Sequence, residues 1–435
     1  MKVLWLCNIM IPAIGEALGL PYSNREGWLT GIYERLKGEN NSLIQLGICF
    51  PMQEIPEQVH RHCGEGLGFS MEGIRCYPFQ EDLTKPEIYD SGLEDRLERI
   101  LKDFTPDLVH IFGTEFPHAL AMVKVYGRPE RTLVGLQGIC SACAESYLAD
   151  LPNRVVERRT FRDWLKKDSI LQQQEKFRRR GEQEREILKR TGHVTGRTAF
   201  DKREAAACNP KAVYHQMNET MRQPFYTGEW EVEKSIPYRI FLSQGDYPLK
   251  GFHYVLRALP YLLDIYPQAC VCVAGNSVVE YTSWKDKIKI SSYGKYLLEL
   301  IRKHKLEEHV KILGRLSAEE MKEQLLKCSI FICPSSLENS PNSLAEAMLL
   351  GVPVAASRTG GIPSLLEEKK EGMLFTPGNV QELTRAVLYL WQKPKEAVRM
   401  AEAGRLRAVR LYDGEKNYWR MLEIYSKIVE GEGNS

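Results

Sequence analysis

The chain has 435 residues, with 59 Lys and Arg against 57 Asp and Glu, and a formal net charge of +2. At roughly 100–200 residues per domain, this length favours two or more domains. A hydrophobic fraction of 43% excludes wholesale disorder, and the near-neutral charge argues against a protein that coats nucleic acid through its overall field. No apolar run reaches the length of a membrane-spanning helix.

The N-terminal stretch is apolar, but Asn8, Pro12 and Glu16 interrupt it and it lacks a clear small-residue cleavage site. Residues 2–7 are therefore expected to form a buried first strand, not part of a signal peptide. The eleven cysteines favour reduced, buried thiols in a cytoplasmic protein over a disulfide framework. The single CxxC of Cys140 and Cys143 has no second pair, so no metal site is expected there.

Short apolar runs alternate with longer helical patterns along the whole chain. The expected strands are residues 2–7, 42–49, 107–112 and 132–136, followed by a second series at 238–242, 269–274, 310–313, 329–333 and 352–356. Their apolar residues are continuous, as in strands covered by helices on both faces. The alternation predicts parallel sheets built from βαβ units, and the polar stretch 227–237 separates two doubly wound α/β domains.

One segment departs from the average charge. Residues 154–190 hold 13 Lys and Arg against 7 Asp and Glu, while their apolar positions are sparse and roughly helical. Two interpretations stay open: a solvated helical pair, or a basic surface that meets an anionic membrane or an acceptor phosphate. Residues 412–429 are expected to form a tail helix with Tyr418, Leu422 and Tyr425 on one face.

The chemistry concentrates in residues 333–363. A strand ends at Cys333, a loop follows, and a helix is expected to begin with Asn342 as its N-cap and to stop at Gly351. This loop would present backbone N–H groups at a helix N-terminus beside the carboxyl end of a parallel strand. Parallel α/β sheets bind phosphates at such places.

Two glutamates bracket this loop at a spacing of E-x7-E. Glu346, expected on the first helical turn, could accept hydrogen bonds from the vicinal diol of a ribose, and Glu338 could accept from sugar hydroxyls. The alternatives are a first-turn glutamate that complements the helix dipole and a plain loop carboxylate.

The stretch 333–363, together with Lys250-Gly251-Phe252, resembles the signature of glycosyltransferase family 4. The resemblance implies the GT-B fold, in which two doubly wound Rossmann-like domains face a central cleft, and retaining transfer of a sugar from a nucleotide diphosphate sugar. By matching position it implies that Glu338 contacts the sugar, that Glu346 binds the ribose and that Lys250 neutralises the diphosphate. It also implies donor contacts from the backbone at Asn342, Ser343, Leu344, Gly275, Arg315 and Leu316.

One departure from the family pattern concerns the diphosphate. The family usually has an arginine five residues before the lysine, where this chain has Gly245 with Gln244 beside it. Arg197, in a turn after a short strand, is the candidate replacement, and Arg222 is the second choice. The alternative for Arg197 is a structural ion pair.

The first half resembles the family less closely. His110 lies in a matching strand, where a satisfied buried histidine is the commoner interpretation, and Gln137 stands where the family has a histidine near the sugar. Both residues are assigned to the acceptor side. Gln137 can hydrogen-bond but cannot be a cation. Either Gly15, in an unusually long first loop, or Gly27 is expected to approach the diphosphate.

The resemblance implies a hexosyltransferase that needs no metal, uses a UDP- or GDP-sugar as co-substrate and modifies a glycan or lipid-linked acceptor in cell-surface polysaccharide assembly. We expect an acceptor domain over residues 1–230, a donor domain over 231–400 and a tail, 401–435, that returns to the first domain. The protein would be cytoplasmic, with peripheral contact at the inner face of the membrane through 154–190. The alternatives are a catalytically weak nucleotide-sugar-binding subunit and a GT-B enzyme of another reaction.

Overall fold

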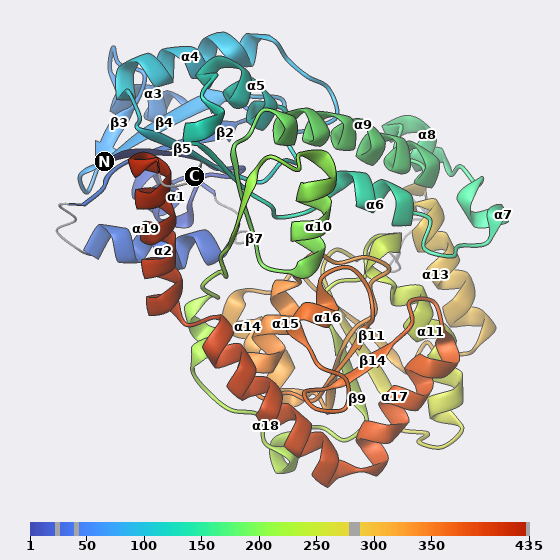
Figure 1. Ribbon diagram of the computed structural model, residues 1–435. Helices are drawn as coiled ribbons and strands as arrows, with labels where there is room; N and C mark the ends of the chain where they lie inside the picture. Colours follow the sequence, from blue (N-terminus) through green and yellow to red (C-terminus); the bar gives the residue numbers. More distant parts are fainter. Residues whose placement is uncertain (22–26, 39–42, 278–287, 432–435) are drawn as a thin grey trace. The chain divides into compact units, whose positions relative to one another are not determined.

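A computed structural model describes residues 1–21, 27–38, 43–277 and 288–431, and the chain divides into two compact units (Figure 1). The first unit comprises Met1–Ser141, Phe177–Arg222 and Tyr412–Ser435, and the second comprises Ala142–Lys176 and Gln223–Leu411. These bounds differ from the expected ones in three respects. Residues 142–176 and residues 223–230 group with the second unit, and only the part of the tail that begins at Tyr412 groups with the first.

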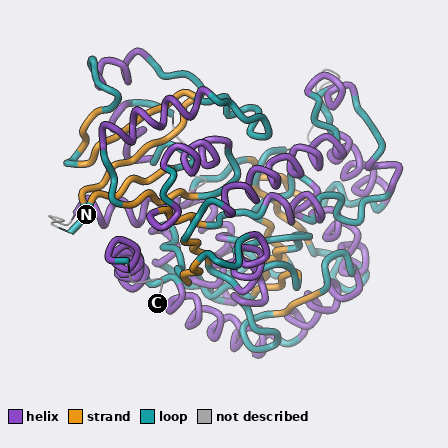
Figure 2. Tube along the Cα trace, turned by 45° about the horizontal axis from the view of Figure 1, so that its top comes forward, coloured by secondary structure: helices purple, strands orange, loops and turns teal. Residues whose placement is uncertain are grey.

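The first unit is built on an eight-stranded sheet. Its strands are β1 (Lys2–Leu6), β2 (Gln45–Met52), β3 (Phe69–Met71), β4 (Ile74–Gln80), β5 (Leu108–Phe112), β6 (Thr132–Gly135), β7 (His193–Gly196) and β8 (Val213–Gln216). They lie in the order β3-β4-β2-β1-β5-β6-β7-β8, and only the pairing of β3 with β4 is antiparallel. The strands of each sheet lie side by side, flanked by helices (Figure 2).

Both faces of this sheet are buried. Along β1, Val3 and Trp5 point into one apolar cluster, whereas Leu4 and Leu6 point into another. The helices that supply these two clusters include α1 (Pro12–Leu18), α2 (Gly27–Gly38) and α19 (Gly414–Glu430) for the first, and α4 (Gly92–Phe104), α5 (Pro117–Tyr126), α9 (Ile170–Lys189) and α10 (Ala199–Cys208) for the second. Burial on both faces accounts for the continuous apolar strands in the sequence.

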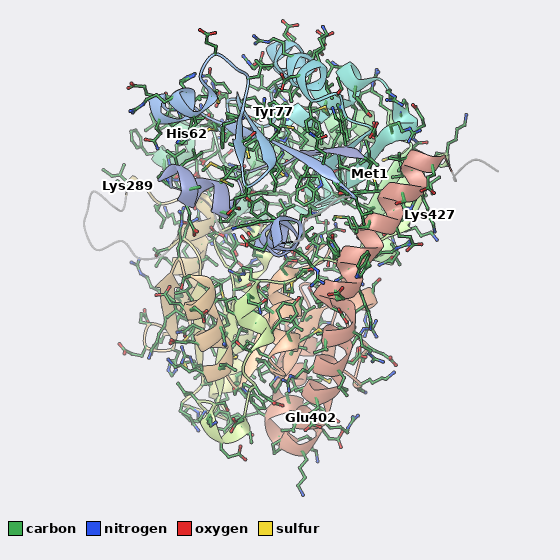
Figure 3. All side chains as sticks on the ribbon, turned by 90° about the vertical axis from the view of Figure 1, so that its left-hand side faces the viewer. Met1, His62, Tyr77, Lys289, Glu402 and Lys427 are labelled. Carbon is green, nitrogen blue, oxygen red and sulfur yellow. The ribbon has the colours of Figure 1, made fainter. Side chains whose placement is uncertain are left out.

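The last helix of the chain completes the first of these clusters. Lys427, labelled in Figure 3, lies near the C-terminal end of α19. On the buried face of the helix, the hydroxyl of Tyr425 accepts a hydrogen bond from Trp5 Nε1 at 2.9 Å and lies 2.6 Å from His110 Nδ1. His110 is the middle residue of β5 and is fully buried. It therefore lies inside the sheet and does not reach the acceptor side to which the sequence assigned it.

Burial lowers the pKa of His110 from its usual value near 6.5 to about 3, so the folded protein holds the ring neutral. The unfolded chain binds a proton there below pH 6.5, and the folded chain does not. Stability from this group is thus present above pH 6.5 and is lost as the pH falls towards 3, at about 1.4 kcal/mol per pH unit within that window. We expect His110→Phe to reduce the pH dependence of the free energy of urea unfolding between pH 6.5 and 4.5.

The matched control is Tyr425→Phe. It removes the same hydrogen bond but keeps the imidazole, so it should lower stability at every pH and leave the slope unchanged. An unaltered slope in His110→Phe would contradict the neutral, buried state of the ring.

The second unit holds a six-stranded, all-parallel sheet. Its strands are β9 (Arg239–Leu242), β10 (Cys270–Ala274), β11 (Val310–Gly314), β12 (Ile330–Cys333), β13 (Val354–Ser357) and β14 (Met373–Phe375), in the order β11-β10-β9-β12-β13-β14. The helices that the site and its surroundings involve are α7 (Asn153–Val156), α8 (Phe161–Lys166), α11 (Phe252–Leu263), α13 (Ser292–Lys303), α15 (Asn342–Leu349), α17 (Val380–Gln392) and α18 (Pro394–Leu411). Among the described helices, none combines the length and apolarity needed to cross a bilayer.

Each expected strand is present, with ends shifted by at most a few residues; residue 42 of the second one lies outside the described ranges. The expectation of a long first loop was wrong. Gly15 lies inside α1, which begins with Pro12 at a position where proline needs no amide partner and ends at Gly19 in the left-handed conformation. Gly15 is buried within a helix and does not belong to a phosphate-binding loop.

Candidate active site

The strand order of the second unit places its reactive groups together. The chain runs from β9 outward to β10 and β11, and then returns to add β12 on the other side of β9. This reversal is the topological switch point, where open α/β sheets bind ligands beyond the carboxyl ends of the strands. Lys250 follows β9 and Glu338 follows β12, so the topology explains why two residues 88 positions apart meet there.

The Lys250 ammonium donates to Glu338 Oε1 at 2.6 Å, and Ser335 Oγ donates to the same oxygen, also at 2.6 Å. The side chains are 22% and 13% exposed, so the pair is largely shielded. Burial alone lowers the pKa of Lys250, but the Glu338 carboxylate outweighs it, and the net shift is upward. Lys250 therefore stays a cation. Within the described residues no protein partner is recorded for Glu338 Oε2.

The loop that carries Glu338 is fixed against the segment after β9. Gly251 has φ +68°, and a Cβ on it would lie 2.0 Å from the carbonyl oxygen of Pro334. The Ser336 amide donates to the Leu249 carbonyl at 2.8 Å. Only glycine fits between these two segments, which explains why the lysine of this motif is followed by glycine.

The segment after β13 supports the same loop from the other side. Gly360 has φ +50°, and a Cβ there would lie 2.0 Å from the Glu338 carbonyl oxygen. The Gly361 amide donates to that oxygen at 2.9 Å, and Thr359 Oγ1 donates to the Ser336 carbonyl at 2.8 Å. Glu338 is thus held on both sides by backbone, which fixes the position of its carboxylate.

Helix α15 begins one residue earlier than expected. Pro341 occupies the N-cap position without a side-chain hydrogen bond, so Asn342 is the first helical residue and not the cap. Glu346 is accordingly the fifth residue of the helix, beyond the first turn, and it is buried. The Leu344 amide donates to the Pro341 carbonyl at 3.1 Å. The backbone N–H group of Ser343 lies in the first turn, at a position that has no intrahelical acceptor.

A chain of polar side chains joins the ends of β9, β10 and β11. Asp246 accepts from Gln244 Nε2 and from Asn276 Nδ2, each at 2.8 Å, and Asn276 Oδ1 accepts from Arg315 Nε at 2.8 Å. Gly275, between β10 and Asn276, has φ +105°, and its amide donates to the Gly314 carbonyl at 2.8 Å. The sequence analysis did not identify Asp246 as a member of this hydrogen-bonded chain. The available signal was that a polar residue follows each of these strands. Leu316 follows Arg315 and is half-buried.

The first unit also has a polar group at the carboxyl edge of its sheet. His118 lies 2.6 Å from Glu81 Oε2 through Nδ1 and 3.0 Å from Asn8 Oδ1 through Nε2. Asn8 Nδ2 donates to Glu115 Oε2 at 3.3 Å, and the Gly138 amide donates to Glu115 Oε1 at 2.7 Å. These residues follow four different strands, so no local sequence pattern connects them.

Arg197 follows β7 at this same edge of the first unit. Its guanidinium forms an ion pair with Glu219, and both side chains are almost completely buried. Burial raises the pKa of Glu219, opposed by Arg197 and by a hydrogen bond from Gln137. The ion pair that the sequence left open as an alternative is therefore present, and Gln137 belongs to the same cluster.

No group of three or more His, Cys, Asp or Glu side chains that could hold a metal ion occurs within the described ranges. The groups that could face an anion at the candidate site are Lys250, Arg315 and the first amides of α15.

These two Rossmann-like units define the GT-B fold, and solved structures share it along the whole chain. Sucrose-phosphate synthase from Thermosynechococcus elongatus superimposes with a TM-score of 0.67 at 13% identity, over 99% of this chain and 100% of that one. HepE from Anabaena, in complex with UDP and glucose, gives a TM-score of 0.66 at 16% identity, over 98% and 100%. At these identities the likeness establishes the fold.

Residues 230–407 match the family model described as "Glycosyl transferases group 1". Amylovoran biosynthesis glycosyltransferase AmsK from Erwinia amylovora is 33% identical over 130 residues, which are 28% of this chain and 32% of that protein. MMP alpha-(1->4)-mannosyltransferase from Mycolicibacterium hassiacum is 27% identical over 194 residues, 44% and 43% of the respective lengths. The chain thus matches less than half the length of these relatives. The segment that matches the family model contains Lys250, Glu338 and Glu346.

Proposed function

We propose that the protein is a retaining glycosyltransferase that moves a sugar from a UDP- or GDP-sugar to a hydroxyl of a glycan or glycolipid. The resemblance to glycosyltransferase family 4 and the relatives named for polysaccharide synthesis favour a role in cell-surface polysaccharide assembly. HepE, of the same fold, binds UDP-glucose, which makes a uridine donor the first to test.

The observation that carries the proposal is the Lys250–Glu338 pair at the switch point of the second sheet. A diphosphate bound there would contact Lys250, which stays protonated although it is largely buried. It would also contact the backbone amides of Asn342 and Ser343 at the N-terminus of α15. Lys250 and Ser335 both donate to Glu338 Oε1, which leaves Oε2 to accept a hydrogen bond from a sugar hydroxyl.

We assign binding of the donor's nucleoside to residues that neighbour the Lys250–Glu338 pair. Buried Glu346 would accept from the ribose hydroxyls, and the backbone near Gly275, Arg315 and Leu316 would meet the base. Because Asn276 already orients Arg315, this side of the site requires little rearrangement on binding.

In the proposed reaction the bond from the sugar C1 to the diphosphate oxygen breaks, and a bond from C1 to the acceptor oxygen forms on the same face. The acceptor proton passes to the departing phosphate oxygen, so no protein nucleophile is required. Lys250 and the α15 amides stabilise the negative charge that develops on the diphosphate, and no metal is needed for this. Glu338 orients the sugar and faces the positive charge of an oxocarbenium-like transition state.

We assign donor binding to the second unit and acceptor binding to the first. The first unit has a cavity of about 550 Å³ lined by Asn8, Met10, Gln53 and Leu83, among others, beside the polar group of Glu115 and His118. Gln137, after β6, is the candidate acceptor-side residue at the same edge. A lipid-linked acceptor would require peripheral contact with a membrane, proposed for residues 154–190.

The second candidate is a nucleotide-sugar-binding subunit with little turnover of its own. The absence of the family's second diphosphate cation favours it, because Gly245 stands in that register and Arg197 is paired with Glu219.

Thermal stability with UDP-, GDP- and ADP-sugars, followed by release of the nucleoside diphosphate, tests both candidates. At 100 times Kd the cognate donor should add about 2.7 kcal/mol to the free energy of unfolding. A stability shift with turnover supports the transferase, a shift without turnover in the presence of diverse acceptors supports the binding subunit, and no shift with any donor contradicts both.

Two variants make this test specific to the site. Glu346→Gln should weaken binding of the nucleoside diphosphate and of the nucleotide sugar equally. Glu338→Gln should weaken only the nucleotide sugar, because this carboxylate is assigned to the sugar. Equal effects of Glu338→Gln on both ligands would contradict that assignment.

A further inference from the structure

Helix α8 exposes an unusual set of side chains. Phe161, Trp164 and Leu165 are 60%, 67% and 64% exposed, and Leu171, a few residues further on, is also exposed. The rings of Phe161 and Trp164 lie together, with centroids 5.9 Å apart. Single exposed apolar residues are ordinary on a protein surface. Three large ones on a six-residue helix form an apolar patch, and such patches mark interaction sites.

The patch is held rigidly. Thr160 and Asp163 form a capping box at the start of α8, and Asp163 is buried. Asp163 Oδ2 also accepts from the Ser292 amide at 3.0 Å, and Ser292 Oγ donates to the Arg158 carbonyl at 2.7 Å. Arg158 in turn pairs with Glu299 of α13 at 2.8 Å. Helix α7, which precedes α8, also contacts α13. Helix α8 is therefore fixed to the second unit, while Phe161, Trp164 and Leu165 stay exposed.

Uncompensated positive charge surrounds the patch. Residues 154–167 hold six Lys or Arg against two Asp or Glu. Arg154, Arg159, Lys166 and Lys167 are exposed, and among the described residues no carboxylate partner is recorded for any of them. The later part of the basic segment differs, because Arg178 on α9 and Arg190, directly after it, pair with glutamates four residues away. The excess charge of residues 154–190 is thus concentrated around α8.

A cavity of about 660 Å³ opens beside Phe161. Its walls include the apolar Ile290 and Leu298, and the cations Arg159, Lys295 and Arg302 lie around it. Apolar walls beneath a group of cations fit a molecule with a hydrocarbon part and an anionic head.

We propose that α8 and the cations around it form a docking surface for an anionic lipid bilayer, with Phe161, Trp164 and Leu165 entering the headgroup region. Aromatic side chains favour that interface, and lysine and arginine are attracted to its negative surface. This inference deepens the membrane contact proposed above and rests on it, narrowing that contact from residues 154–190 to α8 and its surroundings.

The concentration of positive charge favours this occupant over a second copy of the chain. Two copies that meet through α8 would bring Lys166 and Lys167 close to the same residues of the partner, which costs free energy without a counter-charge. A bilayer that contains acidic lipids provides that counter-charge.

The test is co-sedimentation of the full chain with vesicles of phosphatidylcholine alone and of phosphatidylcholine mixed with phosphatidylglycerol. Wild type should bind the acidic vesicles, and the binding should weaken as salt is raised. Lys166→Gln with Lys167→Gln should weaken binding about thirtyfold. Phe161→Ser with Trp164→Ser should abolish it and should remove quenching of tryptophan fluorescence by brominated lipids.

Matched controls come from the same unit. Leu406→Ser alters an apolar side chain on α18 that is 66% exposed, and Lys393→Gln with Lys395→Gln alters two exposed lysines elsewhere. Both controls should bind acidic vesicles like wild type. Equal binding by the α8 variants overturns the proposal, and so does an absence of binding by wild type. If wild type self-associates in the absence of vesicles and Trp164→Ser abolishes that self-association, the patch binds a second copy of the chain. This result would also overturn the proposal.

Donor binding separates this proposal from the proposed function. The α8 variants should retain the thermal shift with the cognate nucleotide sugar, because they lie outside the Lys250–Glu338 site. A variant that loses vesicle binding but keeps the thermal shift with the donor therefore supports the role of α8 and leaves the proposed donor site unaffected.

Discussion

Lys250→Met is expected to lower kcat for sugar transfer by about two to three orders of magnitude, the usual effect of removing one preorganised charge-stabilising group. The ammonium lies 2.6 Å from Glu338 at the switch point of the second sheet, and its pKa is raised, so it carries a full positive charge at neutral pH. That charge would be needed most when the glycosidic bond breaks and the diphosphate gains negative charge. The measurement is steady-state release of the nucleoside diphosphate.

Two further variants control this experiment. Lys395→Met removes an exposed lysine on α18 and should leave kcat unchanged. Lys250→Arg keeps the charge and should recover part of the activity that methionine loses. Circular dichroism at the assay temperature shows whether each variant is folded. Near wild-type kcat in folded Lys250→Met would exclude the lysine from the chemistry.

Arg197→Met is expected to lower the free energy of unfolding by about 3–5 kcal/mol, because it leaves the Glu219 carboxylate buried without its cation. Both side chains are at most 4% exposed, so water cannot replace the lost partner. Glu219→Gln should have a similar effect for the same reason. Urea unfolding at pH 7 measures both variants.

The double variant Arg197→Met with Glu219→Leu distinguishes a structural pair from a catalytic arginine. Removing both charges leaves no buried ion, so the double variant should be more stable than either single variant. It should also retain the thermal shift with the cognate donor. Full stability of Arg197→Met together with a lost donor shift would instead support the role as a diphosphate cation that the sequence suggested.

The sequence predicted most of the fold because strands buried on both faces carry a strong signal. The runs before Cys7, Phe112 and Cys333 are continuous and apolar, and each is a strand. Strand β4 was not expected, since Arg75, Pro78 and Gln80 interrupt its apolar pattern. Strands β3 and β14 have three residues each, too few for any periodicity to appear.

For the candidate site, the motif around Glu338 predicted the loop, and it predicted the helix start to within one residue. The sequence could not predict that Lys250 and Glu338 contact each other, because that contact follows from the strand order. Asp246 was missed for a related reason: its partner Asn276 follows a different strand. The helix began one residue early because Pro341, with its fixed φ, took the cap position expected for Asn342.

The grouping of residues 142–176 with the second unit could not be read from the sequence. It depends on contacts such as that between Asp163 and Ser292, which are 129 residues apart. The composition of the segment indicates only a solvated or basic surface. The same holds for Arg197, whose surroundings are created by the distant residue Glu219.

The position of α19 has a consequence for biosynthesis. Trp5 and Tyr425 are bonded across 420 positions, and Ile424, Tyr425 and Ile428 fill the cluster on one face of the first sheet. Most of the first unit is synthesised early, yet the cluster on this face, to which α1 and α2 also contribute, is complete only once α19 has been synthesised. The second unit lies almost entirely in one continuous stretch and can finish first. The second unit is thus complete before the first, and the apolar residues of the first unit that α19 covers stay exposed until then.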